Sequence, residues 1–217
     1  MAPENRLAEC DDWFKRRPSP LAMTGFLCQY LQSHFEDPKS LEQINLFGFP
    51  GDTLTATGPL HTGGPETPVV IQSVTSWRPD LTDKRPAVVV ARQDWTSERI
   101  GISDRMFGGE VEPDGSIYYC KLYKGAHTLF CVHRSGATVE MLAAEVVNEL
   151  DQFAQNVREE LGLMTFGVAG CGKLFKLEEP KEHYAVPVTV AYVCQRTWRT
   201  IPAAPKLKTV RFTNTKP

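Results

Sequence analysis

Residues 138–161 read TVEMLAAEVVNELDQFAQNVREEL, and this stretch decides the fold. Apolar side chains recur along it every three or four positions, which is the spacing of one face of an α-helix. These side chains are Val139, Leu142, Ala143, Val146, Leu150, Phe153, Val157 and Leu161. Acidic residues fill many of the other positions, and Gly162 follows as a helix end. The pattern predicts one long amphipathic helix with its apolar stripe packed inward.

Strand-like segments precede this predicted helix. Residues 86–91, PAVVVA, form a short β-branched run without polar alternation, which is typical of a strand buried on both faces. Residues 116–123 and 127–133 are two more β-rich runs, and Lys124-Gly125-Ala126 between them predicts a hairpin. In the second run, odd-numbered residues such as Leu129 should share one face of the sheet.

Two more strands are expected after the helix, over residues 164–168 and 184–198. Pro187 lacks an amide donor, so it predicts an edge position or a bulge in the second strand. Before the first sheet strand, residues 19–35 have helical spacing, with Ser19 as N-cap and Pro20 at the first helical position.

We therefore expect a single α+β domain over residues 1–217, with a mixed or mainly antiparallel sheet. The sheet packs against one long amphipathic helix and an N-terminal helix. Glycines and prolines mark a loop-rich insertion at about residues 45–85, in which only the apolar run 69–74 could pair as a strand. An extended basic arm is expected at about residues 199–217.

The composition excludes some classes of protein. The formal charge is −2, which gives no general attraction to a polyanion. No run of 18 apolar residues is present, so we expect no membrane span. The six cysteines include no CxxC pair, which favours reduced, structural thiols in a cytoplasmic product.

One segment resembles a phosphate-binding loop. Residues 167–173, GVAGCGK, match its GxxxxGK portion, which makes a nucleotide-binding enzyme an alternative function. However, Leu174 stands where a magnesium-binding hydroxyl is needed, and the residues that follow have little helical periodicity. We therefore expect a strand that ends in a glycine-rich bend.

The remaining candidate motifs predict no catalytic, cofactor or metal site. His127 and His133 would lie on one strand roughly 20 Å apart, too far to hold a single ion. Trp77, Trp95 and Trp198 have arginines nearby, so they could stack on bases in a small nucleic-acid-binding module. Acidic neighbours balance those arginines, which favours tryptophans that anchor protein interfaces.

The order of the expected elements, most clearly over residues 128–198, resembles that of bacteriophage tail-terminator and neck (head-to-tail interface) proteins. That resemblance implies a structural virion protein and not an enzyme. It implies a homo-oligomeric ring, commonly hexameric, that terminates the tail tube and joins it to the head-side connector. The implied partners are the tail tube or sheath and neck proteins, with DNA only passing through the lumen. The implied location is the virion, after assembly in the host cytoplasm.

The C-terminal arm is the expected contact surface. Residues 199–217 carry five positive side chains and no negative one. Prolines keep this segment extended, so it can reach a neighbouring subunit or a virion partner. The residues expected to make the contact are Lys206, Leu207, Lys208, Val210, Arg211 and Phe212.

Overall fold

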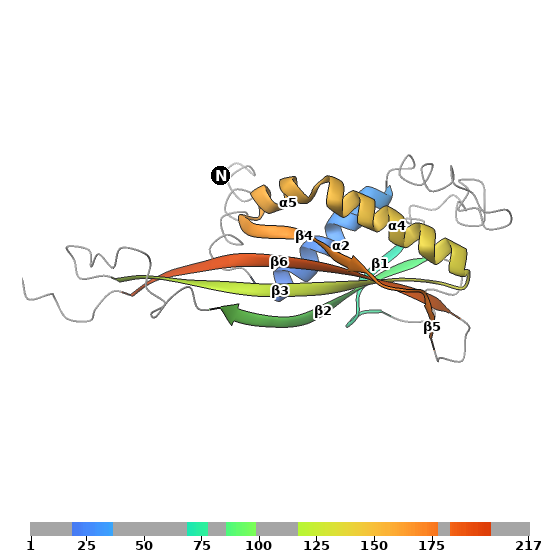
Figure 1. Cartoon of the computed structure of the whole chain (residues 1–217), viewed down its shortest axis with the longest axis horizontal. Helices are drawn as coiled ribbons and strands as arrows, with labels where there is room; N and C mark the ends of the chain where they lie inside the picture. Colours follow the sequence, from blue (N-terminus) through green and yellow to red (C-terminus); the bar gives the residue numbers. More distant parts are fainter. Residues whose placement is uncertain (1–18, 37–68, 78–85, 99–116, 178–182, 201–217) are drawn as a thin grey trace, which may run out of the picture.

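The computed structural model describes residues 19–36, 69–77, 86–98, 117–177 and 183–200. These residues form an α+β fold in which three helices lie over a mixed, six-stranded sheet (Figure 1). In chain order the elements are α2 (Pro20–Glu36), β1 (Val70–Ser73), β2 (Ala87–Glu98), β3 (Ile117–His133), α4 (Gly136–Gln152), α5 (Ala154–Glu160), β4 (Leu163–Cys171), β5 (Phe175–Lys176) and β6 (Tyr184–Thr200).

The sheet order is β1-β2-β3-β6-β4, and β5 pairs with one end of β6. β1 is parallel to β2, and every other described pairing is antiparallel. The PAVVVA segment becomes the buried start of β2, as predicted. The apolar run at residues 69–74 supplies β1, which confirms that it pairs as a strand.

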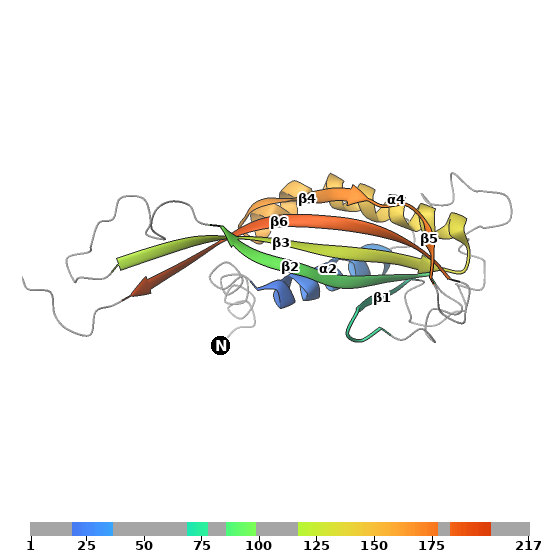
Figure 2. The same ribbon diagram turned by 60° about the horizontal axis from the view of Figure 1, so that its bottom comes forward.

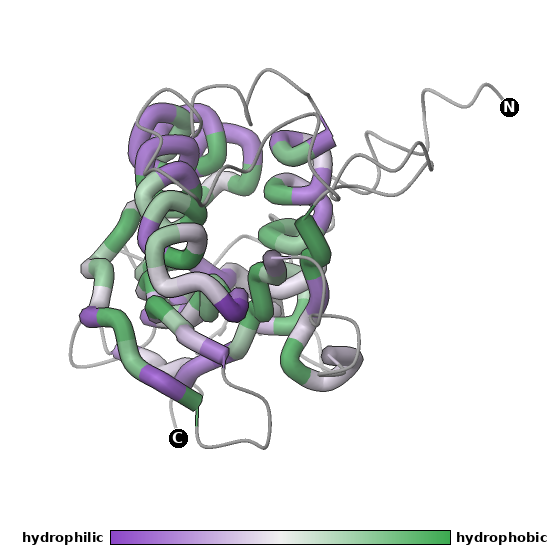
Figure 3. Tube along the Cα trace, turned by 90° about the vertical axis from the view of Figure 1, so that its right-hand side faces the viewer, coloured by the Kyte–Doolittle hydropathy of each residue, from purple (hydrophilic) through white to green (hydrophobic). Residues whose placement is uncertain are grey.

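The main hydrophobic core lies between the helices and one face of the sheet. Seen end-on in Figure 3, α2 and α4 lie side by side above the strands. Odd-numbered residues of β3 and even-numbered residues of β6 face this core, because antiparallel partners such as Leu129 and Val188 share a face. Val132 and Ala185 join a smaller cluster on the opposite face. The predicted alternation along β3 is therefore confirmed.

The N-terminal helix has the predicted start. The backbone N–H of Ala22 donates to Ser19 Oγ at 3.1 Å, which caps a helix that begins at Pro20. Its buried residues Met23, Leu27, Leu31 and Phe35 recur every four positions and face the sheet. This buried face packs α2 onto the same core that α4 covers, so the two helices lie in one layer.

The prediction of one long amphipathic helix over residues 138–161 is wrong, because the helix breaks at Phe153. That residue has φ −105° and ψ 12° and separates α4 from α5. The stripe itself is largely confirmed, since Leu142 and Leu150 are fully buried and Val157 nearly so. Phe153, however, is 36% exposed and does not belong to the core.

The predicted hairpin at Lys124-Gly125-Ala126 is also wrong, because β3 runs without interruption from Ile117 to His133. Gly125 has a different role from that of a turn residue. A Cβ atom there would lie 2.5 Å from Cζ of Tyr192 in β6, so only glycine leaves room for that ring. The glycine reflects close packing across the strands and not a change of direction.

Pro187 lies inside the sheet, paired with Phe130 of β3. Its carbonyl accepts from the N–H of Gly172 at 2.7 Å, where β4 has ended and β5 has not begun. Pro187, which has no amide hydrogen, therefore lies opposite the gap between β4 and β5. The pairing is interrupted at this residue, as expected for a proline, although β6 is not an edge strand. Most of the insertion near residues 45–85, and the arm beyond Thr200, lie outside the described residues.

Candidate functional site

β3 and β6 extend further than the strands beside them. Pairing with β2 ends at Leu122, and pairing with β4 begins at Cys194. Beyond these positions residues 117–121 and 196–200 pair only with one another among the described residues, and we call this pair of segments the ribbon. Figures 1 and 2 show it projecting from the body along the long axis. A two-stranded ribbon is marginally stable in water, so an additional contact would stabilise it.

The ribbon combines stacked aromatic rings with positive charge. Tyr119 and Trp198 face each other across the two strands, with ring centroids 5.4 Å apart and planes inclined by 8°. Trp198 remains 39% exposed. Two residues along, Lys121 lies directly opposite Arg196 on the same face.

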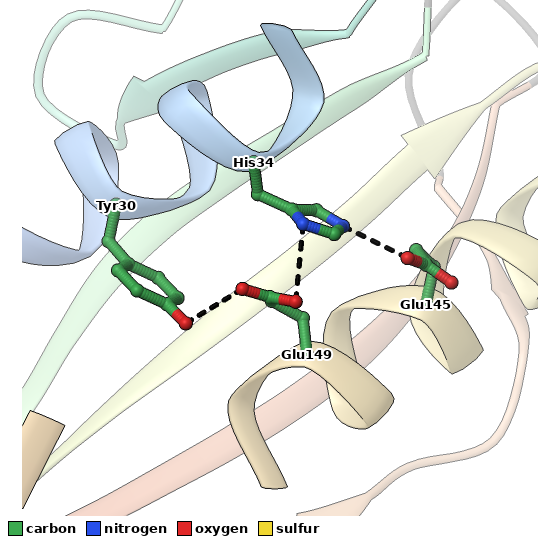
Figure 4. A network of polar contacts seen from close by, with 4 residues as sticks. All are labelled: Tyr30, His34, Glu145 and Glu149. Atoms are coloured by element: carbon green, nitrogen blue, oxygen red, sulfur yellow. Dashed lines mark hydrogen bonds and ion pairs between the residues drawn. The ribbon is translucent and has the colours of Figure 1, made fainter. Parts of the chain in front are cut away.

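Two carboxylates flank His34 at the contact between α2 and α4, and a phenol bonds to one of them. The ring places Nε2 2.9 Å from Glu145 Oε1 and Nδ1 3.2 Å from Glu149 Oε2 (Figure 4). Tyr30, one helical turn earlier, donates its hydroxyl to the other oxygen of Glu149 at 2.7 Å. Burial and this hydrogen bond raise the pKa of Tyr30, so the phenol stays protonated and keeps donating.

Each ring nitrogen of His34 therefore lies within hydrogen-bond distance of a carboxylate oxygen of α4. We define these four residues, Tyr30, His34, Glu145 and Glu149, as the helix latch. It holds α2 against α4.

A second polar contact joins α2 to the sheet. The Thr24 hydroxyl donates to the Pro20 carbonyl at 3.0 Å, so its oxygen accepts from Nε2 of His127, 2.9 Å away. Burial lowers the pKa of His127 to about 4, and the charge of Arg92 lowers it further, while a hydrogen bond to Pro20 opposes both. His127 is therefore a neutral core histidine, stacked on Tyr192 with ring centroids 5.7 Å apart.

The segment that resembles a phosphate-binding loop is built differently. Residues up to Cys171 belong to β4, and strand β5 follows Lys173 after a short connection, so the segment does not lead into a helix as a phosphate-binding loop does. A Cβ atom at Gly172 would lie 2.6 Å from Cγ of Pro187. This glycine, like Gly125, makes room for a side chain of β6. The predicted glycine-rich bend is wrong: β4 continues through Gly167 and Gly170 to Cys171, and β5 then pairs with β6 in the same direction.

The arm residues predicted to make a contact, from Lys206 to Phe212, lie outside the described residues, and their role stays a prediction. The structure shows the ribbon, which the sequence pattern did not predict. The sequence predicts Trp198 as an interface anchor, but it does not predict Tyr119 as its partner, because the expected hairpin is absent from the continuous strand β3. One signal in the sequence could have indicated the ribbon. Residues 117–121 and 196–200 contain aromatic and cationic side chains but lack the alternation of apolar residues that marks a buried strand.

The remaining observations concern the described part of the chain. All five of its cysteines are free thiols, as expected. It contains no cluster of three or more metal-binding side chains and no helix long and apolar enough to cross a membrane. No protein-family model matches this sequence, and no curated protein matches it either.

Proposed function

We propose that this chain is a structural subunit of a bacteriophage tail end or neck, which assembles with copies of itself into a ring. The observation that carries the proposal is the ribbon: a rigid body of sheet and helices presents a projecting pair of strands with aromatic and cationic side chains. Such a projection suits contact with another protein, because rigid aromatic and arginine side chains are the groups that anchor interfaces.

The rest of the described chain supports the same proposal. The helix latch and the contact of Thr24 with His127 fix α2 onto the body, which gives the ribbon a stiff base. The element order resembles that of tail-terminator and neck proteins, for which the implied role is to stop tube growth and join the tail to the head-side connector. The virion location and the hexameric ring are parts of this proposal.

The experiment is a mass measurement of the purified full chain by native mass spectrometry and sedimentation, alone and with tail tubes of its own phage. We expect a discrete oligomer of the ring size, or one that forms on the tube ends. A chain that stays monomeric with tubes present and binds single-stranded DNA with strongly salt-dependent affinity would overturn the proposal. That result would favour a nucleic-acid-binding module, which uses the same aromatic and basic groups.

A further inference from the structure

We propose that β4 of one copy of this chain pairs antiparallel with β4 of a second copy, which joins the two sheets about a two-fold axis at Gly167. This inference goes beyond the proposed function, because two-fold pairing is complete with two copies and cannot by itself build a ring. It therefore concerns the chain on its own. Three features of β4 carry it: an unpaired outer edge, the lack of residues that protect an edge strand, and glycines that the packing of the subunit does not require.

β4 is one of the two terminal strands of the sheet. It pairs with β6 on one side, and no described strand pairs with its other edge (Figure 2). The other terminal strand, β1, has four residues, whereas β4 has nine. An edge strand presents a row of backbone N–H and C=O groups to which a further strand can bond, and a very short edge strand offers few of them. The longer edge of this sheet is therefore the one suited to pairing.

The sequence of β4 lacks the residues that usually prevent pairing at an edge. Natural edge strands carry charged side chains or prolines, which disfavour the addition of another strand. Residues 161–172 contain neither. Two irregularities in the pairing with β6, after Leu163 and after Val168, confine the regular stretch to residues 165–168. A second copy of this stretch would meet no like charge and no missing amide donor.

Two glycines of β4 are not required by the packing of their own subunit. A Cβ atom at Gly167 or Gly170 would meet nothing within 4 Å, and neither residue has a positive φ. Gly125 and Gly172, by contrast, leave room for side chains of β6. Glycine weakens the interior of a strand, and it often marks a place where another backbone approaches closely. At the outer edge of β4, that backbone would belong to another chain.

The apolar side chains of β4 indicate a second copy of the same strand as the partner. Phe166 and Val168 are half-buried and pack on the helix-covered side of the sheet. A two-fold axis perpendicular to the sheet keeps the helices of both copies on one face, so these helix-covered sides join. With the axis at Gly167, Phe166 lies opposite the partner's Val168, and this pair occurs twice. Aromatic residues opposite β-branched residues are favourable cross-strand pairs, so the contact extends both cores.

The test places like charges on the axis. Gly167→Lys and Gly167→Asp each bring two identical charges opposite one another in the dimer, whereas the open space around Gly167 accommodates a side chain in the single subunit. We expect the parent chain to form dimers in sedimentation equilibrium, and each variant to dimerise at least about fivefold more weakly. Gly25→Lys is the matched control, because Gly25 is an exposed glycine of α2 that also has nothing within 4 Å of a Cβ atom. This control should dimerise as the parent does.

Mixing the two charged variants is the decisive step. In an equimolar mixture of Gly167→Lys and Gly167→Asp, opposite charges lie across the axis, so we expect mixed dimers at least as tight as those of the parent chain. Melting temperatures close to that of the parent show that the variants fold. The inference is wrong if the parent chain stays monomeric at its highest soluble concentration, if either variant alone dimerises as the parent does, or if the mixture does not associate.

Failure of this inference can be told apart from failure of the proposed function. If Gly167→Lys no longer dimerises but still forms rings on tail tubes, the β4 pairing and the proposed function both stand. If the parent chain forms rings on tail tubes but no dimer that Gly167→Lys weakens, only the β4 pairing fails. A dimer that Gly167→Lys weakens, without any ring on tail tubes, would support the β4 pairing and remove the proposed function.

Discussion

The two halves of the β3–β6 pair have the same backbone pairing and opposite surroundings. Between Cys131 and His127 the strand lies beneath α2 and α4, and its core-facing side chains are fully buried. Between Lys121 and Ile117 the ladder continues in register, and none of the described helices extends over it. The side chains change accordingly, from aliphatic residues to an aromatic stack and paired cations. A continuous ladder can therefore be buried as core at one end and exposed at the other.

The largest expected effect comes from the covered half. Leu150→Ala should lower the free energy of unfolding by about 2 to 5 kcal/mol, because the side chain is fully buried and its removal leaves a cavity. The matched control is Phe153→Ala, three residues along the same helix pattern, which should cost less than about 1 kcal/mol because the ring is partly exposed. Chemical denaturation of both variants checks the difference. Equal losses would show that Phe153 contributes to the core after all.

The next effect is a pH dependence of the covered half. His127 has a pKa of about 4 in the folded chain and about 6.5 when unfolded, so the unfolded chain binds the proton more tightly. The stability that comes from keeping the His127 ring neutral is complete above pH 6.5. It is lost as the pH falls toward 4, by about 1.4 kcal/mol of unfolding free energy for each pH unit in that window. Denaturation curves at pH 7, 5.5 and 4 measure it.

The control for this prediction is His127→Gln, which cannot titrate. Subtracting its pH profile from that of the parent chain removes the contribution of all other titratable groups. If the two profiles run parallel between pH 7 and pH 4, His127 is not buried as a neutral ring, and its lowered pKa is wrong.

The sequence predicted much of the covered half because burial imposes regular spacing. The β-branched start of β2, the alternation along β6 and the stripe through Leu142 and Leu150 all reflect one buried face each. Each pattern can be recognised within one segment, without knowing which strand or helix packs against it. The α+β class and the mixed sheet followed from them.

The errors came from residues whose role depends on distant neighbours. Gly125 was interpreted as part of a turn, although it is glycine because the ring of Tyr192 occupies the place of its side chain. No glycine or proline lies near Phe153 that would predict the helix break there. The helix latch joins residues more than 100 positions apart, so no local spacing could predict it. The ribbon was missed because exposed strand ends carry no periodic pattern.

A smaller effect is expected in the helix latch. Tyr30→Phe removes the hydroxyl that donates to Glu149, which should cost about 1 to 2 kcal/mol, since hydrogen bonds to charged groups contribute more than neutral ones. The double variant Tyr30→Phe with Glu149→Gln should cost less than the sum of the two single variants, because both remove the same bond. Strict additivity in this double-mutant cycle would contradict the contact.

The smallest expected effect on the stability of the subunit comes from the uncovered half. Trp198→Ala should change the free energy of unfolding by less than about 0.5 kcal/mol, because the ring is 39% exposed and the ribbon can open locally without unfolding the body. The same substitution should weaken self-association, since it removes half of the aromatic stack of the ribbon. Trp198→Phe keeps a ring opposite Tyr119 and should assemble more tightly than the alanine variant. Denaturation at low protein concentration and sedimentation across a concentration series separate the two effects. A loss of stability as large as that of Leu150→Ala would place Trp198 in the core of its own subunit, and the two halves of the ladder would then not differ as argued.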